Sequence, residues 1–439
     1  MVGPSDDGVD RRPLLQLVRT WTWAPWAIGA MFVLRFVAVA GLRAYVYVDS
    51  GEYDRLDFTG HWRRPWGTPL LYWLVPGGPN RIVVAQALVG ALCWGVLALS
   101  AAAWFRTPSF RIGVAGTLLA LGATTSMTNW DAAKLSESLA RSLTALVVAA
   151  WLNLVRRPGR ATALLVLLAT FPWMFVRQSL MPTAWMIALV SAAAAITVWR
   201  RGGPAKLLAV LSLSLLGLAT LASFSYARNQ EVVRENLTVI VANRVASEPT
   251  RLAWFQAHGM PTPASGDLGP DALRSDPAFV HWVGHEGRST YARYVLTHPW
   301  YSATEPLSDL VGVRRSYGDK AAPQSTMLSP ADAYGSSRPV IPELVEQALF
   351  EPGGTGAMIS GIGLVLAWTL ARWDWRERRW IVPLAMMAIS FLSLIVAWHG
   401  ATPELGRLAV VGAVVLRFGL VLQLAGLAEQ EFLARRRSP

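Results

Sequence analysis

The stretch IVVAQALVGALCWGVLALSAAAW, which runs from Ile82 to Trp104, contains no charged residue and decides the fold class of this chain. In helical conformation, about 20 apolar residues are enough to cross the roughly 30 Å hydrocarbon layer of a bilayer. The stretch is followed at once by a basic segment that starts at Arg106. It therefore predicts a transmembrane helix.

The composition of the whole chain agrees with a membrane protein. Apolar residues make up 53% of the 439 positions and charged residues only 15%, whereas a soluble domain carries about a quarter charged residues. The one cysteine, Cys93, lies inside the first stretch. Neither a disulfide framework nor a thiolate metal site is therefore expected.

Ten segments are long and apolar enough, or nearly so, to span a membrane. They cover residues 25–47, 82–104, 111–126, 137–155, 161–178, 182–199, 206–225, 354–372, 380–398 and 407–427. We therefore expect an all-α polytopic membrane protein with about ten transmembrane helices. We expect that the first span is not cleaved off as a signal peptide, because no short apolar core with a small-residue cleavage site follows the N-terminal arginines.

The net charge of +12 has its explanation in membrane topology rather than in nucleic-acid binding. With ten crossings, the basic loops all fall on one side: 106–111, 156–160, 200–203, 372–379 and 435–437. Cytoplasmic loops carry the excess of Lys and Arg. Residues 1–24 and 428–439 are then cytoplasmic, the protein is a multi-pass protein of the cell membrane, and Asp49 faces outward.

Two expected outer segments are too long to be simple connectors. Residues 48–81 are rich in Trp, Pro and charge, and Leu70 to Val75 suit an element that lies in the membrane interface. Residues 226–353 hold most of the polar sequence and predict a mainly helical outer domain, with helix-like patterns over Glu231 to Val245 and Asp276 to Thr297. They separate a seven-span module (25–225) from a three-span module (354–427).

Four acidic residues follow the first expected span within nine positions: Asp49, Glu52, Asp54 and Asp57. Transfer of a sugar to a hydroxyl needs a base near the acceptor proton, and a carboxylate can serve. If the segment is helical, Asp49 and Glu52 share a face. The alternative is a solvated helix start with acids near the positive end of the helix dipole. We favour a functional role for Asp49, which is nearest the membrane.

Basic residues are expected at the same membrane level. Arg63 and Arg64 precede Pro65-Trp66-Gly67-Thr68-Pro69 and could clamp a phosphate or a sugar, although snorkelling to headgroups explains them equally well. Lys134 lies near the same face and is a candidate phosphate contact. Arg177 and Arg407 occupy outer turns and suit an anionic lipid phosphate, with generic interface anchoring as the alternative.

Five further polar residues have a structural alternative or no assigned role. Glu137 and Arg141 stand four apart, which is the spacing of a helix-stabilising ion pair. His399, in the last outer turn, is more often a structural hydrogen-bonding residue than a base. Arg35 and Arg417 lie near the middles of the first and last spans and should face the bundle interior, because an isolated charge in hydrocarbon is costly.

These motifs, taken together and in this order, resemble the GT-C class of polytopic glycosyltransferases. Asp49-Ser-Gly-Glu-Tyr53 ends the first span, Arg64-Pro-Trp-Gly-Thr-Pro69 is similar to the Arg-x-Pro-Gly-Tyr-Pro motif of the family, and Ser136-Glu-Ser138 opens the fourth span. A large outer loop follows the seventh span. The class uses polyprenyl-phosphate sugars and includes protein O-mannosyl and aminoarabinose transferases. The likeness covers the seven N-terminal spans and is looser beyond them.

The resemblance implies that an acid of the first outer loop is the catalytic base, which maps to Asp49. Basic residues that hold the lipid phosphate would map to Lys134, Arg177 and Arg407. Thr68 stands where the family has Tyr. The chain has no Asp-x-Asp motif, so a metal site or other cofactor is not predicted.

The sequence therefore predicts transfer of a sugar from a polyprenyl-phosphate donor to a glycan, lipid or protein acceptor on the outer face. A lipid or small-anion transporter and a polysaccharide polymerase or ligase are the alternatives; neither a nucleic-acid partner nor a nucleotide-binding loop is expected. The predicted catalytic residues are Asp49 and Glu52. The predicted substrate-binding residues are Tyr53, Arg63, Arg64, Glu137 and His399.

Overall fold

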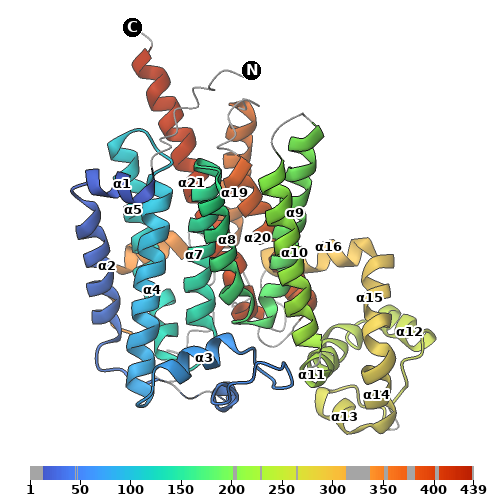
Figure 1. Ribbon diagram of the computed structural model, residues 1–439. Coiled ribbons are helices and arrows are strands. Elements are labelled where there is room, and N and C mark those ends of the chain that lie inside the picture. The colour runs from blue at the N-terminus through green and yellow to red at the C-terminus, as the bar shows by residue number, and fades with distance from the viewer. Residues whose placement is uncertain are drawn as a thin grey trace.

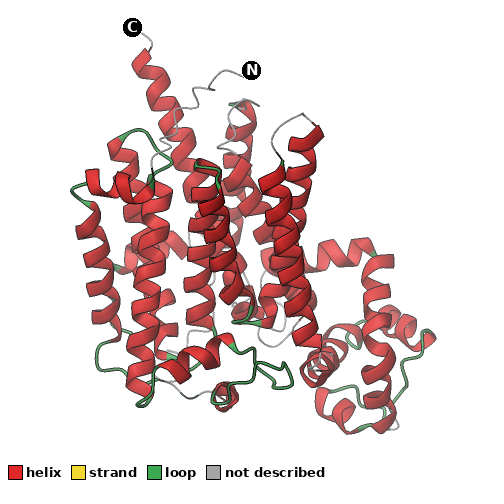
Figure 2. Cartoon of the chain, viewed as in Figure 1, coloured by secondary structure: helices red, strands yellow, loops and turns green. Residues whose placement is uncertain are grey.

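The computed structural model is built from helices. It describes residues 13–44, 46, 48–200, 205–227, 230–263, 265–312, 337–350, 354–372, 381–400 and 405–437. Figure 2 shows helices joined by loops, and no strand occurs in these ranges. The all-α prediction is confirmed for the described part of the chain.

A helix lies in each of the ten segments expected to span the membrane. In chain order these helices are α2 (Ala24–Val39), α4 (Pro79–Ala102), α5 (Pro108–Ala123), α7 (Glu137–Arg156), α8 (Arg160–Met174), α9 (Met181–Arg200), α10 (Lys206–Ala227), α19 (Gly354–Ala371), α20 (Ile381–Gly400) and α21 (Leu405–Arg437). A short helix, α1 (Leu14–Thr20), precedes them. The segment expected to be a C-terminal tail continues α21 up to Arg437.

Among the described helices, six are long and apolar enough to cross a membrane: Asn80–Ala102, Glu137–Arg156, Gln178–Arg200, Lys206–Tyr226, Ile381–Gly400 and Val411–Arg436. A seventh is reached if α5 and residues 125–132, bent by 53° at their junction, form one broken span. Three further apolar helices are shorter. The chain is therefore a membrane-embedded helical protein, and the count of ten crossings stays a prediction.

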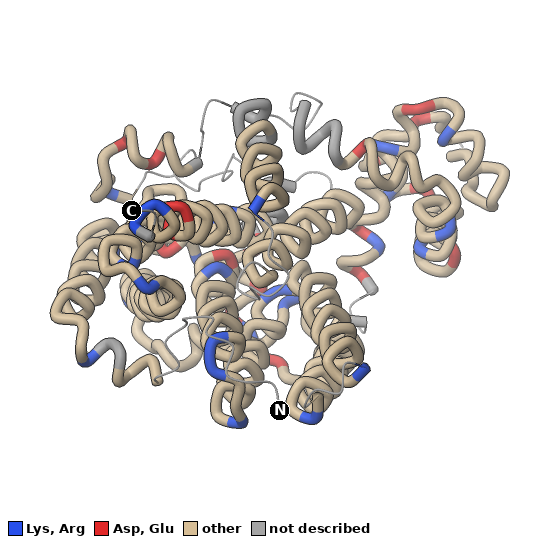
Figure 3. Tube along the Cα trace, turned by 90° about the horizontal axis from the view of Figure 1, so that it is seen from above, with Lys and Arg blue, Asp and Glu red and all other residues tan. Residues whose placement is uncertain are grey.

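The basic helix ends gather at one end of the bundle. The last residues of α4, α7 and α9 and the first residues of α5, α8 and α10 lie at the end where α21 finishes (Figure 1). The view onto that end shows Lys and Arg at the helix tips (Figure 3). This distribution agrees with the predicted cytoplasmic side. Which compartment this end faces stays a prediction.

The first membrane helix is shorter than predicted. Helix α2 ends at Val39 rather than near residue 47. Gly41 has a φ of 81°, in the left-handed region that glycine occupies at helix ends. The acidic residues of the first outer loop therefore do not end this helix. Asp49 and Glu52 lie in a separate 3₁₀ helix, η1 (Val48–Tyr53), and Asp54 and Asp57 follow it.

Short helices lie at the opposite end of the bundle from the basic tips. Helix α3 (Gly67–Leu74) runs across this end (Figure 1), with Trp73 exposed and Tyr72 buried. The apolar element predicted over residues 70–75 is therefore a helix with one face against the bundle. Three more short elements contribute to this end: α6 (Thr125–Thr128), η2 (Asn129–Ala132) and η3 (Gln178–Leu180).

An outer helical domain stands beside the same end (Figure 1). Its elements are α11 (Gln230–Ile240), the π-helical turn η4 (Val241–Val245), α12 (Pro249–Ala257), α13 (Pro270–Ser275), α14 (Pro277–Trp282), the π-helical turn η5 (Val283–Gly287), α15 (Arg288–Thr297) and α16 (Pro299–Gly312). Both predicted helical patterns are confirmed. Phe255 and Phe279, at 0% exposure, centre its core. The Arg244 guanidinium lies 3.7 Å from the centre of the Trp398 ring of α20 and joins this domain to the bundle.

The chain after residue 336 returns to the bundle. Helix α18 (Glu343–Phe350) carries Glu346, whose carboxylate accepts the backbone N–H groups of Thr125 at 3.1 Å and Ser126 at 2.8 Å. The Asn129 side-chain oxygen accepts the backbone N–H of Ser337 at 2.6 Å. The predicted outer segment 226–353 thus ends with residues that pack against α6 and η2.

Both arginines at mid-span face the interior, as predicted. Arg35 is 2% exposed and pairs with Asp131 at 2.5 Å, while its other terminal nitrogen donates to the Gly122 carbonyl at 2.9 Å. The absence of a side chain at Gly90 makes room for this guanidinium, since an added Cβ would lie 2.5 Å from its central carbon. Arg417, 6% exposed, donates to two backbone carbonyls.

Substitution of Arg35 by Met should destabilise the protein by about 3–5 kcal/mol, because it leaves the Asp131 carboxylate buried without its cation. The double variant Arg35→Met/Asp131→Leu should recover much of this loss, because removing both charges removes the desolvation cost as well. Thermal unfolding of the purified protein in detergent measures both effects.

The control variant is Arg435→Met, which removes an ion pair to Glu431 from a side chain that is 80% exposed. Exposed pairs contribute little, so its unfolding temperature should match that of the wild type. Equal loss in Arg35→Met and Arg435→Met would contradict a structural role for the buried pair.

Candidate functional site

The η1 helix brings Asp49 and Glu52 to one arginine. A 3₁₀ helix has three residues per turn, so side chains at i and i+3 project in the same direction. One terminal nitrogen of Arg64 lies 2.9 Å from a carboxylate oxygen of Asp49, and its Nε lies 2.5 Å from one of Glu52. The predicted shared face is therefore confirmed, and both acids sit against a fixed positive charge.

Arg63 extends this cluster to the outer domain. It lies 3.1 Å from Glu52 and pairs also with Glu231 of α11. The hydrogen bond to Glu231, followed by that to Glu52, raises the pKa of Arg63 above its usual value. With 44% of the Arg63 side chain exposed, the contact adds little stability, but it ties the first outer loop to the domain beside it.

Backbone contact at Gly67 sets the position of this arginine pair. The Gly67 N–H donates to the Phe175 carbonyl at 2.9 Å, and the Trp66 ring stacks on that of Phe175 at 4.9 Å. A Cβ at position 67 would lie only 2.6 Å from the same carbonyl oxygen. A residue without a side chain is therefore needed where α3 meets the end of α8.

Tyr53 connects the acidic segment to the start of α7. Its hydroxyl donates to the Ser136 hydroxyl at 3.1 Å, and the Arg64 guanidinium lies 5.3 Å from the centre of its ring. The side chain is only 2% exposed. Tyr53 therefore acts here as a buried contact between two segments, and its predicted role in substrate binding stays a prediction.

Glu137 and Arg177 form a buried ion pair at 2.9 Å, with side chains 0% and 9% exposed. The alternative prediction, an ion pair between the side chains of Glu137 and Arg141, is wrong. Arg141 donates to the backbone carbonyls of Glu137 at 3.1 Å and Ser126 at 3.0 Å. A buried ion pair is favourable only when both partners are present, so Glu137 holds Arg177 at this end of the bundle.

Two other loop acids have different partners. Asp54 pairs with Lys134, the predicted phosphate contact. Asp57 accepts hydrogen bonds from Thr59 and from the backbone N–H of Trp62 at 2.9 Å. The hydrogen bond from the Thr59 hydroxyl lowers the pKa of Asp57. Asp57 therefore shapes the loop, which agrees with the structural alternative for this residue.

Eight of the predicted site residues gather at the end of the bundle where α3 lies (Figure 1). They fall into three contact groups: Asp49, Glu52, Tyr53, Arg63 and Arg64; Glu137 and Arg177; and Lys134 with its partner Asp54. The Tyr53–Ser136 hydrogen bond links the first group to the chain segment that carries the other two.

Of the two remaining predicted residues, His399 does not join this cluster. The ring nitrogens of His399 contact the Tyr291 hydroxyl at 3.1 Å and the Ser302 carbonyl at 3.0 Å, so His399 fastens the outer domain to α20. This geometry favours the structural alternative over substrate binding. The side chain of Arg407 lies outside the described residues.

The space beside Arg64 is small. A cavity of about 10 Å³ is lined there by Trp62, Trp66 and Tyr226, among others. This volume suits one water molecule. Within the described ranges, no group of three or more His, Cys, Asp or Glu side chains is arranged to hold a metal ion.

Sequence reasoning missed two residues that organise the site. Asp131, with an exposure of 0%, pairs with Arg35 and accepts a hydrogen bond from Ser138 at 2.5 Å. Glu231 holds Arg63. A lone arginine at mid-span signals a buried acid somewhere in the chain, but it does not say which acid.

The chain matches no protein-family model, and no curated protein matches it either.

The variant Gly67→Ala should destabilise the protein by about 1–3 kcal/mol, the usual cost of forcing extra volume into a packed site. The added methyl group would push α3 away from Phe175. The matched variant Gly51→Ala lies in the same loop region, where an added Cβ meets nothing within 4 Å. Thermal unfolding should separate the two, and an unchanged Gly67→Ala protein would disprove the close approach.

Proposed function

We propose that this protein is a membrane glycosyltransferase of the GT-C type. It transfers a sugar from a polyprenyl-phosphate donor to an acceptor on the extracytoplasmic face, with Asp49 as the catalytic base. The observation that carries the proposal is the pairing of Asp49 and Glu52 with Arg64 in one turn. A carboxylate positioned within hydrogen-bond reach of an acceptor hydroxyl can serve as a general base.

The reaction needs few groups. Asp49 takes the proton of the acceptor hydroxyl while the hydroxyl oxygen bonds to the anomeric carbon. The bond from that carbon to the phosphate oxygen breaks, its electron pair stays on the phosphate, and polyprenyl phosphate leaves. Attack from the face opposite the phosphate inverts the anomeric centre. Lys134, Arg177 and Arg407 are proposed to hold the donor phosphate. The two arginines also stabilise the charge on the departing phosphate, because fixed cations lower the free energy of such a transition state.

Glu52 is best assigned a positioning role. It lies against both arginines of the loop, 3.1 Å from Arg63 and 2.5 Å from Arg64. It therefore fixes the guanidinium that contacts Asp49. This assignment modifies the expectation that Glu52 is itself catalytic.

One argument for the transporter alternative concerns the arginines at mid-span. Arg35 and Arg417 favour it slightly on sequence grounds, because charged residues inside a membrane often mark a transport path. Arg35 is paired with Asp131, and Arg417 donates to the Leu349 and Ala413 carbonyls. Both therefore have structural partners within the bundle. A polysaccharide polymerase or ligase remains the other alternative and shares the proposed donor chemistry.

The variant Asp49→Asn should lower sugar transfer by about 10²–10⁴-fold, the contribution of a positioned general base. The amide keeps the size of the carboxylate and can still contact Arg64. The assay follows release of polyprenyl phosphate from a radiolabelled polyprenyl-phosphate sugar, alongside labelled product. Movement of the donor without its cleavage would favour a transporter.

Asp271→Asn is the control for this variant, because that carboxylate is 97% exposed on α13 of the outer domain. Its activity should equal that of the wild type. Near-normal turnover in Asp49→Asn, with intact folding, would rule out Asp49 as the base.

The variant Lys134→Gln should raise the KM for the donor about tenfold with little change in kcat, as expected for a contact made equally in ground and transition states. The matched variant Asp54→Asn removes the same ion pair but keeps the lysine charge. Its KM should therefore stay low. Equal KM values in the two variants would show that the ion pair matters, and not contact between Lys134 and phosphate.

A further inference from the structure

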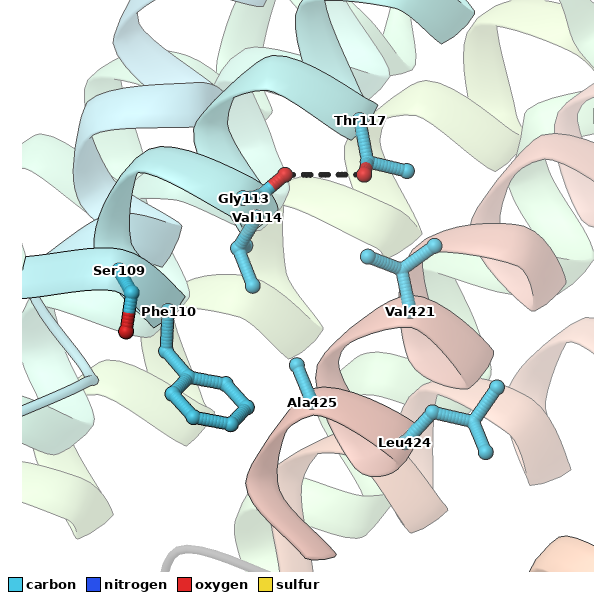
Figure 4. A pocket seen from close by; sticks show the side chains of 8 residues that line it. All are labelled: Ser109, Phe110, Gly113, Val114, Thr117, Val421, Leu424 and Ala425. Carbon is cyan, nitrogen blue, oxygen red and sulfur yellow. Dashed lines mark hydrogen bonds between the residues drawn. The ribbon is translucent and has the colours of Figure 1, made fainter. Parts of the chain in front are cut away.

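A groove of about 520 Å³ opens between α5 and α21 (Figure 4). Its lining includes Phe110, Gly113, Val114, Val421, Leu424 and Ala425. The groove lies toward the end of the bundle where α21 finishes, away from α3 and the acidic cluster (Figure 1). The proposed transfer site therefore does not account for it.

The walls of the groove suit an apolar chain. Gly113 leaves its width open, since an added Cβ would meet nothing within 4 Å. The Thr117 hydroxyl donates to the Gly113 carbonyl at 2.9 Å, so its hydrogen is used within α5 (Figure 4). The volume falls in the range of about 300–1,000 Å³ that small-molecule sites have. Leu424, 43% exposed, adds apolar surface at the edge.

The surroundings of the groove restrict what can fill it. Residues 411–436 form one of the candidate membrane spans, and α5 belongs to the bent pair that would make another. Hydrocarbon therefore surrounds the groove, and a lipid chain reaches it more easily than a soluble peptide does.

Positive charge lies at the mouth of the groove. The Phe110 ring packs against Phe432 at 6.0 Å between centres, and the Arg436 guanidinium lies 4.5 Å above the Phe432 ring. Arg111 follows Phe110 directly but does not line the groove. Its Nε donates to the Phe105 carbonyl at 2.7 Å, and its guanidinium lies 5.4 Å from the centre of the Trp21 ring. The cation at the mouth is therefore Arg436, which pairs with no carboxylate among the described residues.

The acids nearby are already engaged. Glu429 accepts the backbone N–H groups of Arg106 at 2.9 Å and Thr107 at 2.7 Å. Glu431 pairs with Arg372 at 2.7 Å and with Arg435 at 3.2 Å. The Glu431 charge is therefore offset by two arginines, and the Glu429 carboxylate is held by backbone N–H groups.

We propose that the groove binds an anionic glycerophospholipid of the adjacent leaflet, with an acyl chain between α5 and α21 and the phosphate at Arg436. The apolar walls take the chain, and the cation selects the headgroup, because basic residues at a membrane surface attract anionic lipids. This site is independent of the proposed sugar transfer. Its test is a binding measurement.

Native mass spectrometry of the purified full-length protein provides this test. Phosphatidylglycerol and phosphatidylcholine with identical acyl chains are added in equal amounts after delipidation. The wild type should retain phosphatidylglycerol about fivefold better, as expected for one surface cation. Equal retention of the two lipids would overturn the proposed selectivity.

Gly113→Leu tests the binding of the acyl chain, and Arg436→Gln tests the binding of the headgroup. Gly113→Leu fills the groove and should lower phosphatidylglycerol retention about tenfold, the loss expected from about two methylene contacts. Gly116→Leu is its match, since position 116 lies on the same helix, also meets nothing within 4 Å and does not line the groove. Its retention should be that of the wild type.

Arg436→Gln should reduce the preference for phosphatidylglycerol while leaving phosphatidylcholine retention unchanged. Arg436 is exposed, so this substitution should leave the fold intact and keeps the test independent of Gly113→Leu. Wild-type retention in Gly113→Leu would overturn the groove as the site, and an unchanged lipid preference in Arg436→Gln would overturn its assignment as a headgroup contact.

Discussion

The ion pair between Arg35 and Asp131 is the interaction on which the rest of the structure depends. Asp131 is fully buried and holds three segments together, since it pairs with Arg35 of α2 and accepts the Ser138 hydroxyl at the start of α7. In an apolar interior, a charge without its partner costs several kcal/mol. The chain from η2 to the start of α7 is therefore fixed in place, and with it Lys134 and Glu137.

Around that fixed segment, the candidate site is assembled by alternating charges. Arg64 lies between Asp49 and Glu52, Arg63 lies between Glu52 and Glu231, and Arg177 lies against Glu137. Each contact joins residues far apart in the chain, except those within the first outer loop. The outer domain is coupled to the loop through Glu231, so movement of that domain would change the position of Arg63. A substrate phosphate would have to share or replace these acids as partners of the arginines.

The two ends of the bundle are built for different chemistry. At one end, short helices and acids form a polar surface with a water-sized cavity. At the other, the helix tips carry arginines and a groove runs down the side of α5 and α21. A membrane environment explains this asymmetry, since basic residues concentrate on one side of a bilayer and apolar grooves face its hydrocarbon. The clamp of Arg244 on Trp398 and the contacts of His399 then fasten the outer domain to the polar end.

The sequence alone determined the helical membrane class and the location of its helices, because a helix that crosses hydrocarbon needs an apolar stretch of a set length. It also determined the inward orientation of Arg35 and Arg417, because an isolated charge that faces hydrocarbon is costly. It also predicted that Asp49 and Glu52 share a face, which is a property of local helix geometry. It did not predict that α2 ends at Val39, because the apolar pattern continues through a glycine whose backbone conformation only the fold reveals. The partners of the charges were decided by tertiary structure alone. Glu137 pairs with Arg177 and not with Arg141, which is closer in sequence, and Arg35 pairs with Asp131. The energy of an ion pair depends on the distance between the charges and on their burial, and not on their separation along the chain.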